Sequence, residues 1–143
     1  MIYLQEPLNF NPKFEIVSCF VEFNGGFVLL HRQDNKSQGN TWGMPAGKVK
    51  LGEKILDAIV RELLEETGLA ISSDKLVYFN KIFVRSDEYD FIYHIFVAKF
   101  NEKPLIIISP KEHKAFKWVT PKEALHMPLI HELGNCIKLY YKV

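Results

Sequence analysis

The segment from Gly47 to Leu69, which reads GKVKLGEKILDAIVRELLEETGL, constrains the fold of this chain more than any other part of it. Its apolar residues recur every three or four positions, which is the spacing of one face of an α-helix. They predict a buried stripe made of Ile55, Ala58, Ile59, Leu63 and Thr67. Gly68 follows the last turn, where a residue in the left-handed conformation often ends a helix. This signature segment therefore predicts an amphipathic helix that ends at Gly68.

The same helix carries a dense group of carboxylates. Glu65 and Glu66 lie three and four residues after Glu62, so the three are expected to share a face other than the apolar stripe. Like charges at this spacing destabilise a helix by about 0.2–0.5 kcal/mol per pair, and a bound cation would remove that repulsion. Two adjacent glutamates alone would indicate only a solvated surface. Three of them beside Arg61 favour a site for Mg²⁺ or Mn²⁺, which prefer oxygen ligands, over a structural zinc site.

The spacing of the signature segment also matches a known pattern. From Gly47 it reads glycine, five residues, glutamate, seven residues, then arginine, glutamate, apolar, any, glutamate, glutamate, any, glycine, apolar. This pattern resembles the Nudix box at every constrained position. The resemblance implies an α/β (α+β) architecture, the Nudix fold, in which a mixed β-sheet is sandwiched between α-helices, with residues 1–143 as a single Nudix hydrolase domain. It also implies hydrolysis of a nucleoside diphosphate that is linked to another group.

The resemblance implies a set of metal ligands and a general base. Glu62, Glu65 and Glu66 would hold Mg²⁺ or Mn²⁺ together with the backbone carbonyl of Ala46. Glu112 occupies the place of a loop glutamate that holds metal or activates water in related hydrolases. Members of the family differ in which glutamate acts as the base, so Glu62 and Glu112 are both candidates for that catalytic role.

Positively charged residues near the box have implied roles as well. Arg61 would orient a carboxylate of the box, with Glu53 as its partner, and would not touch the substrate. MutT-type members have stretches similar to LLHR and WGMPA ahead of the box. In those members the equivalents of Arg32 and Lys48 face phosphates, which makes these two the candidate substrate-binding residues. Without the resemblance, each would be read as an ordinary surface cation.

Departures from the MutT pattern leave the substrate open. Ala46 replaces the first glycine of the pair usual in MutT, and Lys50 stands where many relatives have an acidic residue. Features of the ADP-ribose, NADH and diadenosine polyphosphate subgroups are absent or not clearly placed. The default prediction is a MutT-like nucleoside triphosphate pyrophosphohydrolase, suited to removing modified nucleotides. The alternatives are a GDP-mannose-type nucleotide-sugar hydrolase and a non-catalytic nucleotide sensor, although the intact box disfavours both.

Length and charge agree with a compact enzyme. The chain has 143 residues, 48% of them hydrophobic, which is enough for one domain with a substantial core. Its 18 basic and 17 acidic residues leave a formal charge of only +1, so nothing favours binding to a nucleic acid polymer or to a membrane surface. The expected partner is a small-molecule nucleotide, and the chain is expected to act as a monomer or homodimer.

Targeting signals and cysteine content predict a cytoplasmic protein. The start, MIYLQEPLNF, lacks the basic and apolar regions of a signal peptide, and no later apolar stretch approaches membrane-spanning length. Cys19 and Cys136 are too few for a disulfide framework and are expected to be buried, reduced thiols.

Strand and helix patterns alternate along the rest of the chain. A hairpin turn is predicted at Asn24-Gly25-Gly26, and a helix start at Thr120, which is followed by proline and then by glutamate at the capping position. The predicted strands span residues 14–23, 27–32, 76–84 and 91–100, with a further short one over 105–108 as an option, and a final helix spans about 129–141.

Overall fold

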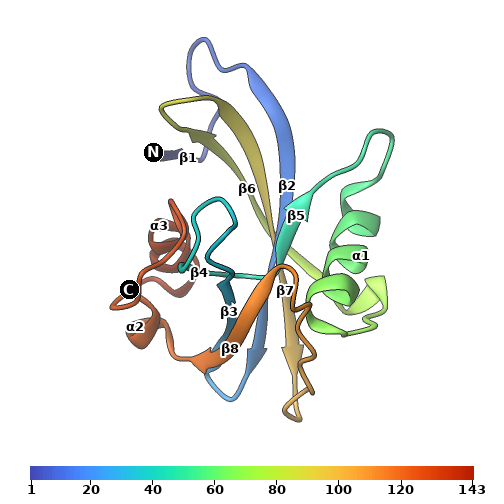
Figure 1. Cartoon of the computed structure of the whole chain (residues 1–143). Helices are drawn as coiled ribbons and strands as arrows, with labels where there is room; N and C mark the ends of the chain where they lie inside the picture. The colour runs from blue at the N-terminus through green and yellow to red at the C-terminus, as the bar shows by residue number, and fades with distance from the viewer.

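The computed structural model describes residues 1–143, and a curved mixed sheet forms its centre (Figure 1). The strands follow the order β1-β6-β7-β2-β3-β4, with β5 beside β2 and β8 beside β3. The strands are β1 (Ile2–Tyr3), β2 (Pro12–Phe23), β3 (Gly26–Arg32), β4 (Trp42–Gly43), β5 (Ala46–Lys48), β6 (Val77–Arg85), β7 (Asp90–Phe100) and β8 (His113–Val119). The helices are α1 (Ile55–Thr67), the single 3₁₀ turn η1 (Ser73–Lys75), α2 (Pro121–Ala124) and α3 (Leu133–Tyr141).

The sheet is mixed because of the pairing of its central strand, β2. This strand runs parallel to β7, with Phe23 opposite Phe100, and antiparallel to β3 and β5. Parallel neighbours cannot be joined by a tight hairpin, so the chain between β2 and β7 includes the crossover helix α1. The predicted hairpin of β2 and β3 is present, and Gly25 in its turn has a φ of +77° that suits glycine.

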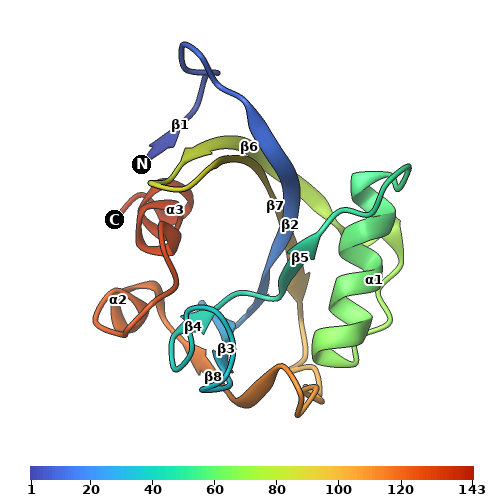
Figure 2. The ribbon, with the colours of Figure 1, turned by 45° about the horizontal axis from the view of Figure 1, so that its top comes forward.

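Helices cover both faces of the sheet, as predicted. Figure 2 shows α1 on one side and α2 with α3 on the other. Successive residues of β2 point to opposite faces, so Cys19 and Val21 pack in the cluster beneath α1 while Phe20 packs in the cluster beneath α3. Each large apolar side chain buried in this way contributes about 1.5–3 kcal/mol to stability. Cys136 lies in the second cluster, so the two cysteines are buried, free and on opposite faces.

Helix α1 forms and ends as the sequence predicts. Ala58, Ile59 and Leu63 are fully buried against the sheet. Gly68 takes the left-handed conformation with a φ of 74°, and its N–H donates to the carbonyl of Leu64 at 3.0 Å. This cap turns the chain away from the helix axis, which fixes the C-terminal turn of α1 beside the sheet.

The sheet divides next to this helix. Ile16 to Ser18 of β2 pair with β5, whereas β2 pairs with β3 only at Glu22 and Phe23. At the division, the N–H of Cys19 donates to the carbonyl of Pro45 at 3.1 Å. The short strand β5 is therefore held along the upper half of β2, directly beside α1 (Figure 1).

Two element predictions are wrong. Residues 105–108 form no strand, and the segment is held instead by a hydrogen bond from the Ile107 N–H to the Thr67 carbonyl at 2.8 Å. The final helix begins at Leu133 and not near residue 129, because Glu132 has a φ of 68°, which is outside the right-handed helical region.

In the last third of the chain, α2 was predicted and β8 was not. Thr120 caps α2 with the predicted capping box, in which Thr120 and Glu123 exchange hydrogen bonds. Strand β8 was not predicted, since its sequence HKAFKWV alternates only weakly. None of the helices is long and apolar enough to span a membrane.

Candidate active site

β5 and the C-terminal half of α1 lie side by side and carry most of the predicted site (Figure 2). Gly47 of β5 faces α1, and a β-carbon at this position would overlap the carboxylate of Glu62. Any larger residue would push the strand away from the helix or displace Glu62. The glycine of the signature segment therefore allows the backbone of β5 to approach a helix carboxylate closely.

Glu66 is the most buried carboxylate of the site. Its residue is 9% exposed, and its Oε1 accepts a hydrogen bond from the Ala46 N–H at 2.8 Å. Burial, together with the negative charges of Glu62 and Glu112, raises the pKa of Glu66 to about 8, although the Ala46 N–H opposes the shift. No other hydrogen bond or ion pair stabilises the charged form of Glu66. A cation at this carboxylate would relieve the unfavourable charge.

Glu53 has the opposite environment, because Arg61 binds it with both arms of its guanidinium. Arg61 Nε lies 2.9 Å from Glu53 Oε2, and Arg61 Nη2 lies 2.9 Å from Glu53 Oε1. The Lys50 N–H also donates to Glu53 at 3.0 Å. The Arg61 hydrogen bonds, followed by that from Lys50, lower the pKa of Glu53 to about 2. The predicted contact between Arg61 and Glu53 is present.

We call the two hydrogen bonds from Arg61 to Glu53 the clamp, and Arg61 also contacts two further groups. Its Nη1 lies 2.6 Å from Glu62 Oε1, and its Nη2 donates to the Lys48 carbonyl at 3.2 Å. Burial raises the pKa of Glu62 while the bond from Arg61 opposes that shift. Arg61 thus ties the loop after β5 to α1 and holds Glu62 next to Gly47.

Glu65 lies beside Glu62, since the same nitrogen of Arg61 contacts both, but it is far more exposed than the other two glutamates. Glu62 and Glu66 are four residues apart and both face β5, whereas the side chain of Glu65 is 55% exposed. Its one contact is a 3.4 Å ion pair with Arg61. The helix turns by about 100° per residue, so Glu65 lies at the solvent edge of the pair.

Glu112 reaches the site from the loop before β8. Its backbone carbonyl accepts a hydrogen bond from the Gln33 N–H at 3.0 Å, and its half-exposed carboxylate pairs with Lys36 Nζ at 3.2 Å. The charge of Glu112 raises the pKa of Glu66. The structure therefore brings Glu112 within electrostatic range of the helix carboxylates, although the two positions are far apart in the sequence.

The two candidate phosphate-binding cations come from different strands, Arg32 from the end of β3 and Lys48 from the end of β5. Arg32 Nε donates to the Ser37 carbonyl at 2.8 Å, and the charge of Arg32 lowers the pKa of Glu66. Lys48 Nζ lies over the ring of Phe14, 4.3 Å from its centre. Neither cation forms an ion pair with a carboxylate.

The donors in this region fit a hard divalent cation by their chemistry. They are carboxylates and backbone carbonyls, with no cysteine or histidine among the predicted ligands. No set of three or more His, Cys, Asp or Glu side chains is arranged closely enough to hold an ion. Arg61 holds Glu62, and Lys36 holds Glu112, so these two carboxylates are engaged by cations of the chain itself.

Sequence reasoning missed Lys36 and Phe14. Lys36 pairs with a carboxylate 76 positions away, and Phe14 lies beneath a lysine of another strand. No local pattern predicts either contact, because each depends on how the sheet brings distant segments together. The polar composition of the loop over residues 33–41 was the only available signal for Lys36.

The chain is similar to known hydrolases over most of its length. The sequence family described as NUDIX domain matches residues 12–140. A CTP pyrophosphohydrolase of Escherichia coli K12 is 30% identical over 115 residues, which cover 80% of this chain and 82% of that protein. The crystal structure of a MutT protein from Methanosarcina mazei Go1 has a TM-score of 0.78 at 23% identity and covers 95% of this chain and 97% of that one.

A second solved structure carries ligands. It is a bifunctional NMN adenylyltransferase/ADP ribose pyrophosphatase from Francisella tularensis in complex with AMP and a manganese ion. Its TM-score is 0.74 at 22% identity, and the match covers 94% of this chain and 42% of that one. At such identities the two solved structures show that the fold is shared.

Proposed function

Since the chain belongs to the Nudix family of hydrolases, we propose that it is a divalent-metal-dependent nucleoside triphosphate pyrophosphohydrolase. The products would be a nucleoside monophosphate and pyrophosphate. The similarity to a CTP pyrophosphohydrolase makes CTP the first substrate to test. A modified nucleoside triphosphate is the second, since a MutT-like enzyme is suited to removing such nucleotides.

The buried carboxylate of Glu66 is the observation that carries this proposal. Its pKa of about 8 means that the charged form of Glu66 is unfavourable, so near neutral pH this group holds a proton unless a metal cation takes its place. Members of the family typically use divalent metal ions. Glu66 would hold such an ion first. Glu62, Glu65, Glu112 and the carbonyl of Ala46 would join it by turning toward the ion, because no three of these side chains converge in the metal-free arrangement. When bound, the ion supplies positive charge that offsets the charge developing on the phosphate oxygens.

The residues of the chain then divide the remaining tasks. Water attacks the α- or the β-phosphorus, the bond from that phosphorus to the oxygen bridging the two breaks, and a glutamate accepts the proton of the water. Glu62 suits this role because its pKa is raised, and Glu112 suits it because its carboxylate is more exposed. Arg61 keeps Glu62 in place, while Arg32 and Lys48 bind the phosphates.

Hydrolysis of a substrate panel with Mg²⁺ or Mn²⁺ tests the proposal. The panel contains CTP, the other nucleoside triphosphates, 8-oxo-dGTP, nucleotide sugars, ADP-ribose and dinucleoside polyphosphates, with products identified by mass spectrometry. We expect a nucleoside triphosphate to be the best substrate and to need the metal. Reactions in ¹⁸O-labelled water then identify the attacked phosphorus, because the label enters either the monophosphate or pyrophosphate.

Other outcomes of the panel would replace the proposal. Release of a free sugar from GDP-mannose would indicate carbon–oxygen cleavage by a nucleotide-sugar hydrolase. Tight nucleotide binding with no turnover of any compound would indicate a sensor. The cytoplasmic location and the choice between monomer and homodimer stay predictions, to be checked by fractionation and by light scattering.

A further inference from the structure

We propose that Phe14 is a positioning residue, whose ring holds the ammonium group of Lys48 where it meets the substrate phosphates. The inference rests on the proposed function, because it assigns Lys48 a phosphate to bind. Phe14 lies outside the signature segment, near the start of β2. The ligand of Lys48 in this proposal is a phosphate group of the substrate.

The backbone of Lys48 is anchored in the site. The Lys48 carbonyl accepts a hydrogen bond from Arg61 at 3.2 Å, and the preceding residue, Gly47, lies against Glu62. Side chains alternate along a strand, so Gly47 faces α1 and Lys48 faces the other side of β5. There the ammonium group lies 4.3 Å from the centre of the Phe14 ring.

This placement leaves the charge of Lys48 available. Lys48 is exposed, and none of the ion pairs in the structure involves it. The face of an aromatic ring attracts a cation but does not neutralise it. A long lysine side chain is otherwise free to adopt many rotamers, and fixing it on binding would weaken affinity. The Phe14 ring restricts that freedom before the substrate arrives.

Other aromatic rings fix Phe14 in turn. The Phe91 ring stacks on it, with centres 5.5 Å apart and an interplanar angle of 22°, and the Tyr89 ring packs at 5.1 Å in a tilted arrangement. Lys13 Nζ in turn lies over the Tyr89 ring, 5.6 Å from its centre. Phe14 is therefore part of a cluster and is not a loose surface side chain.

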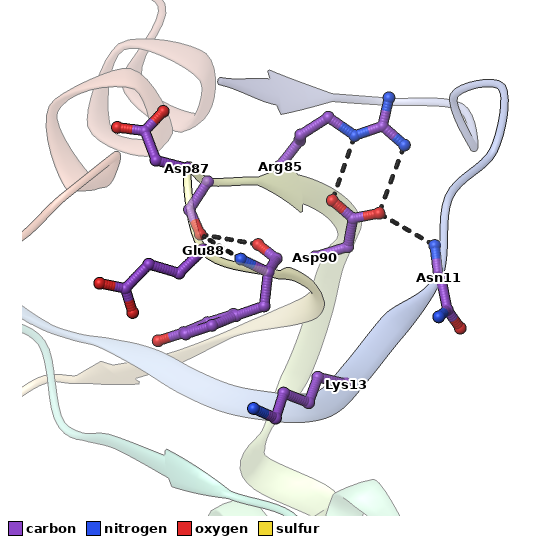
Figure 3. A pocket seen from close by; sticks show the side chains of 8 residues that line it. Asn11, Lys13, Arg85, Asp87, Glu88 and Asp90 are labelled. Atoms are coloured by element: carbon purple, nitrogen blue, oxygen red, sulfur yellow. Dashed lines mark hydrogen bonds and ion pairs between the residues drawn. The ribbon is translucent and has the colours of Figure 1, made fainter.

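Polar contacts stabilise the hairpin between β6 and β7, with Arg85 and Asn11 both directed at Asp90 (Figure 3). Arg85 binds Asp90 at 3.1 and 3.3 Å, and the Asn11 N–H donates to the same carboxylate at 2.9 Å. Ser86 Oγ donates to the Tyr89 carbonyl at 2.7 Å. These bonds join the hairpin to the start of β2, which is where Phe14 lies. Tyr89 also lines a depression of about 410 Å³ beside the hairpin.

Binding of magnesium pyrophosphate, measured by calorimetry, tests the inference without turnover. This probe has phosphates but no base, so a loss of affinity cannot come from lost base stacking. We expect Phe14→Leu to weaken binding about two- to fivefold, the range expected for one exposed cation–π contact. Phe14→Tyr keeps the ring face and should bind like the wild type. Phe10→Leu is the matched control, because Phe10 lies against Phe83 and Arg85 and not against Lys48.

A double-mutant cycle separates positioning from a structural effect. Lys48→Met should weaken pyrophosphate binding, and adding Phe14→Leu to it should cause no further loss, because the ring acts only through Lys48. With CTP as substrate, Phe14→Leu should raise KM by the same factor and leave kcat unchanged. Thermal unfolding of each variant checks that the fold is intact.

The outcomes distinguish this inference from the proposed function. Equal pyrophosphate affinity of Phe14→Leu and the wild type would overturn the inference, as would an additive loss in the double mutant. Absence of any pyrophosphate binding by the wild type would overturn it too, since Lys48 would then have no phosphate to meet. Pyrophosphate binding that depends on Phe14, in a protein that hydrolyses no member of the panel, would retain the inference and reject the enzyme.

Discussion

Glu53 and Glu66 are carboxylates of one signature segment, yet they differ in burial and in whether a cation of the chain pairs with them. Glu53 receives both arms of Arg61 and a backbone N–H, and its pKa is about 2. Glu66 is buried with one backbone N–H, and its pKa is about 8. A cation of the chain, Arg61, pairs with Glu53, whereas Glu66 forms no ion pair. The comparison separates a structural clamp from a site that needs an added cation.

Gly47 and Arg61 connect these two regions. Arg61 spans from Glu53 to Glu62, and Gly47 gives Glu62 the space it occupies beside β5. The ionised Glu53 thus anchors Arg61, which in turn holds Glu62 beside β5. A change at Glu66 should therefore affect catalysis directly. A change at Glu53, Arg61 or Gly47 should affect it through the position of Glu62.

The largest expected effect is the loss of turnover in Glu66→Gln. The amide has nearly the same shape but no charge, so metal-dependent hydrolysis of the best panel substrate should fall by about 10²–10³-fold, as when a group that stabilises the transition state is removed. The variant should stay folded, which circular dichroism checks. An unchanged rate would remove Glu66 from the site.

The next effect is expected from Gly47→Ala. The added methyl group overlaps the Glu62 carboxylate, so the strand or the glutamate has to move, which should destabilise the protein by about 1–3 kcal/mol and lower kcat/KM. Urea unfolding and steady-state kinetics measure the two effects. In a Glu62→Ala background the same substitution should be nearly neutral for stability. A full stability loss in that background would show that another contact is responsible.

The pH dependence of the metal-free protein should reveal the proton on Glu66. Its native pKa of about 8 lies above the ordinary value of 4.5, so the native state binds more protons than the unfolded chain between these pH values. The free energy of unfolding should therefore fall as pH rises from 5 to 8, by on the order of 2–4 kcal/mol. Urea unfolding in EDTA measures this trend.

Glu66→Gln is the reference for this experiment, because it lacks the titrating group. His113, whose pKa is lowered to about 4, has the opposite dependence between pH 4 and 6.5, and it cancels in the difference between the two proteins. Adding Mg²⁺ at pH 8 should restore the stability of the wild type alone. A pH-independent difference would mean that Glu66 titrates normally.

The smallest effect is expected from the clamp. Arg61→Lys keeps the charge but cannot bind Glu53 through two parallel hydrogen bonds, so kcat should fall by about tenfold while KM for the nucleotide is unchanged. Steady-state kinetics at saturating Mg²⁺ measure both constants. A higher KM with unchanged kcat would instead indicate that Arg61 touches the substrate.

Local signals in the sequence predicted the elements with strong patterns. The apolar stripe of α1, the cap at Gly68 and the capping box at Thr120 are short-range features, and all three are present. The option of a strand over residues 105–108 was wrong, because a short run of apolar residues does not say whether a partner strand lies beside it. The start of α3 was wrong because the left-handed Glu132 has no sequence marker.

The candidate site was predictable in its residues and not in its geometry. The spacing of the signature segment indicated Glu53, Arg61 and the helix glutamates, and Arg61 does bind Glu53. Spacing could not tell the buried Glu66 from the exposed Glu65, since both lie near the edge of the apolar stripe and only packing against β5 decides between them.

The sequence by itself determined the helix, its end and the chemical types in the site, because these depend on interactions between residues a few positions apart. The tertiary structure alone decided which carboxylate is neutralised and which is not. It divides the sheet beside β2, brings Ala46 to Glu66 and places Lys48 over Phe14. Burial and charge act through space, so the pKa of each glutamate depends on neighbours that no local stretch of sequence contains.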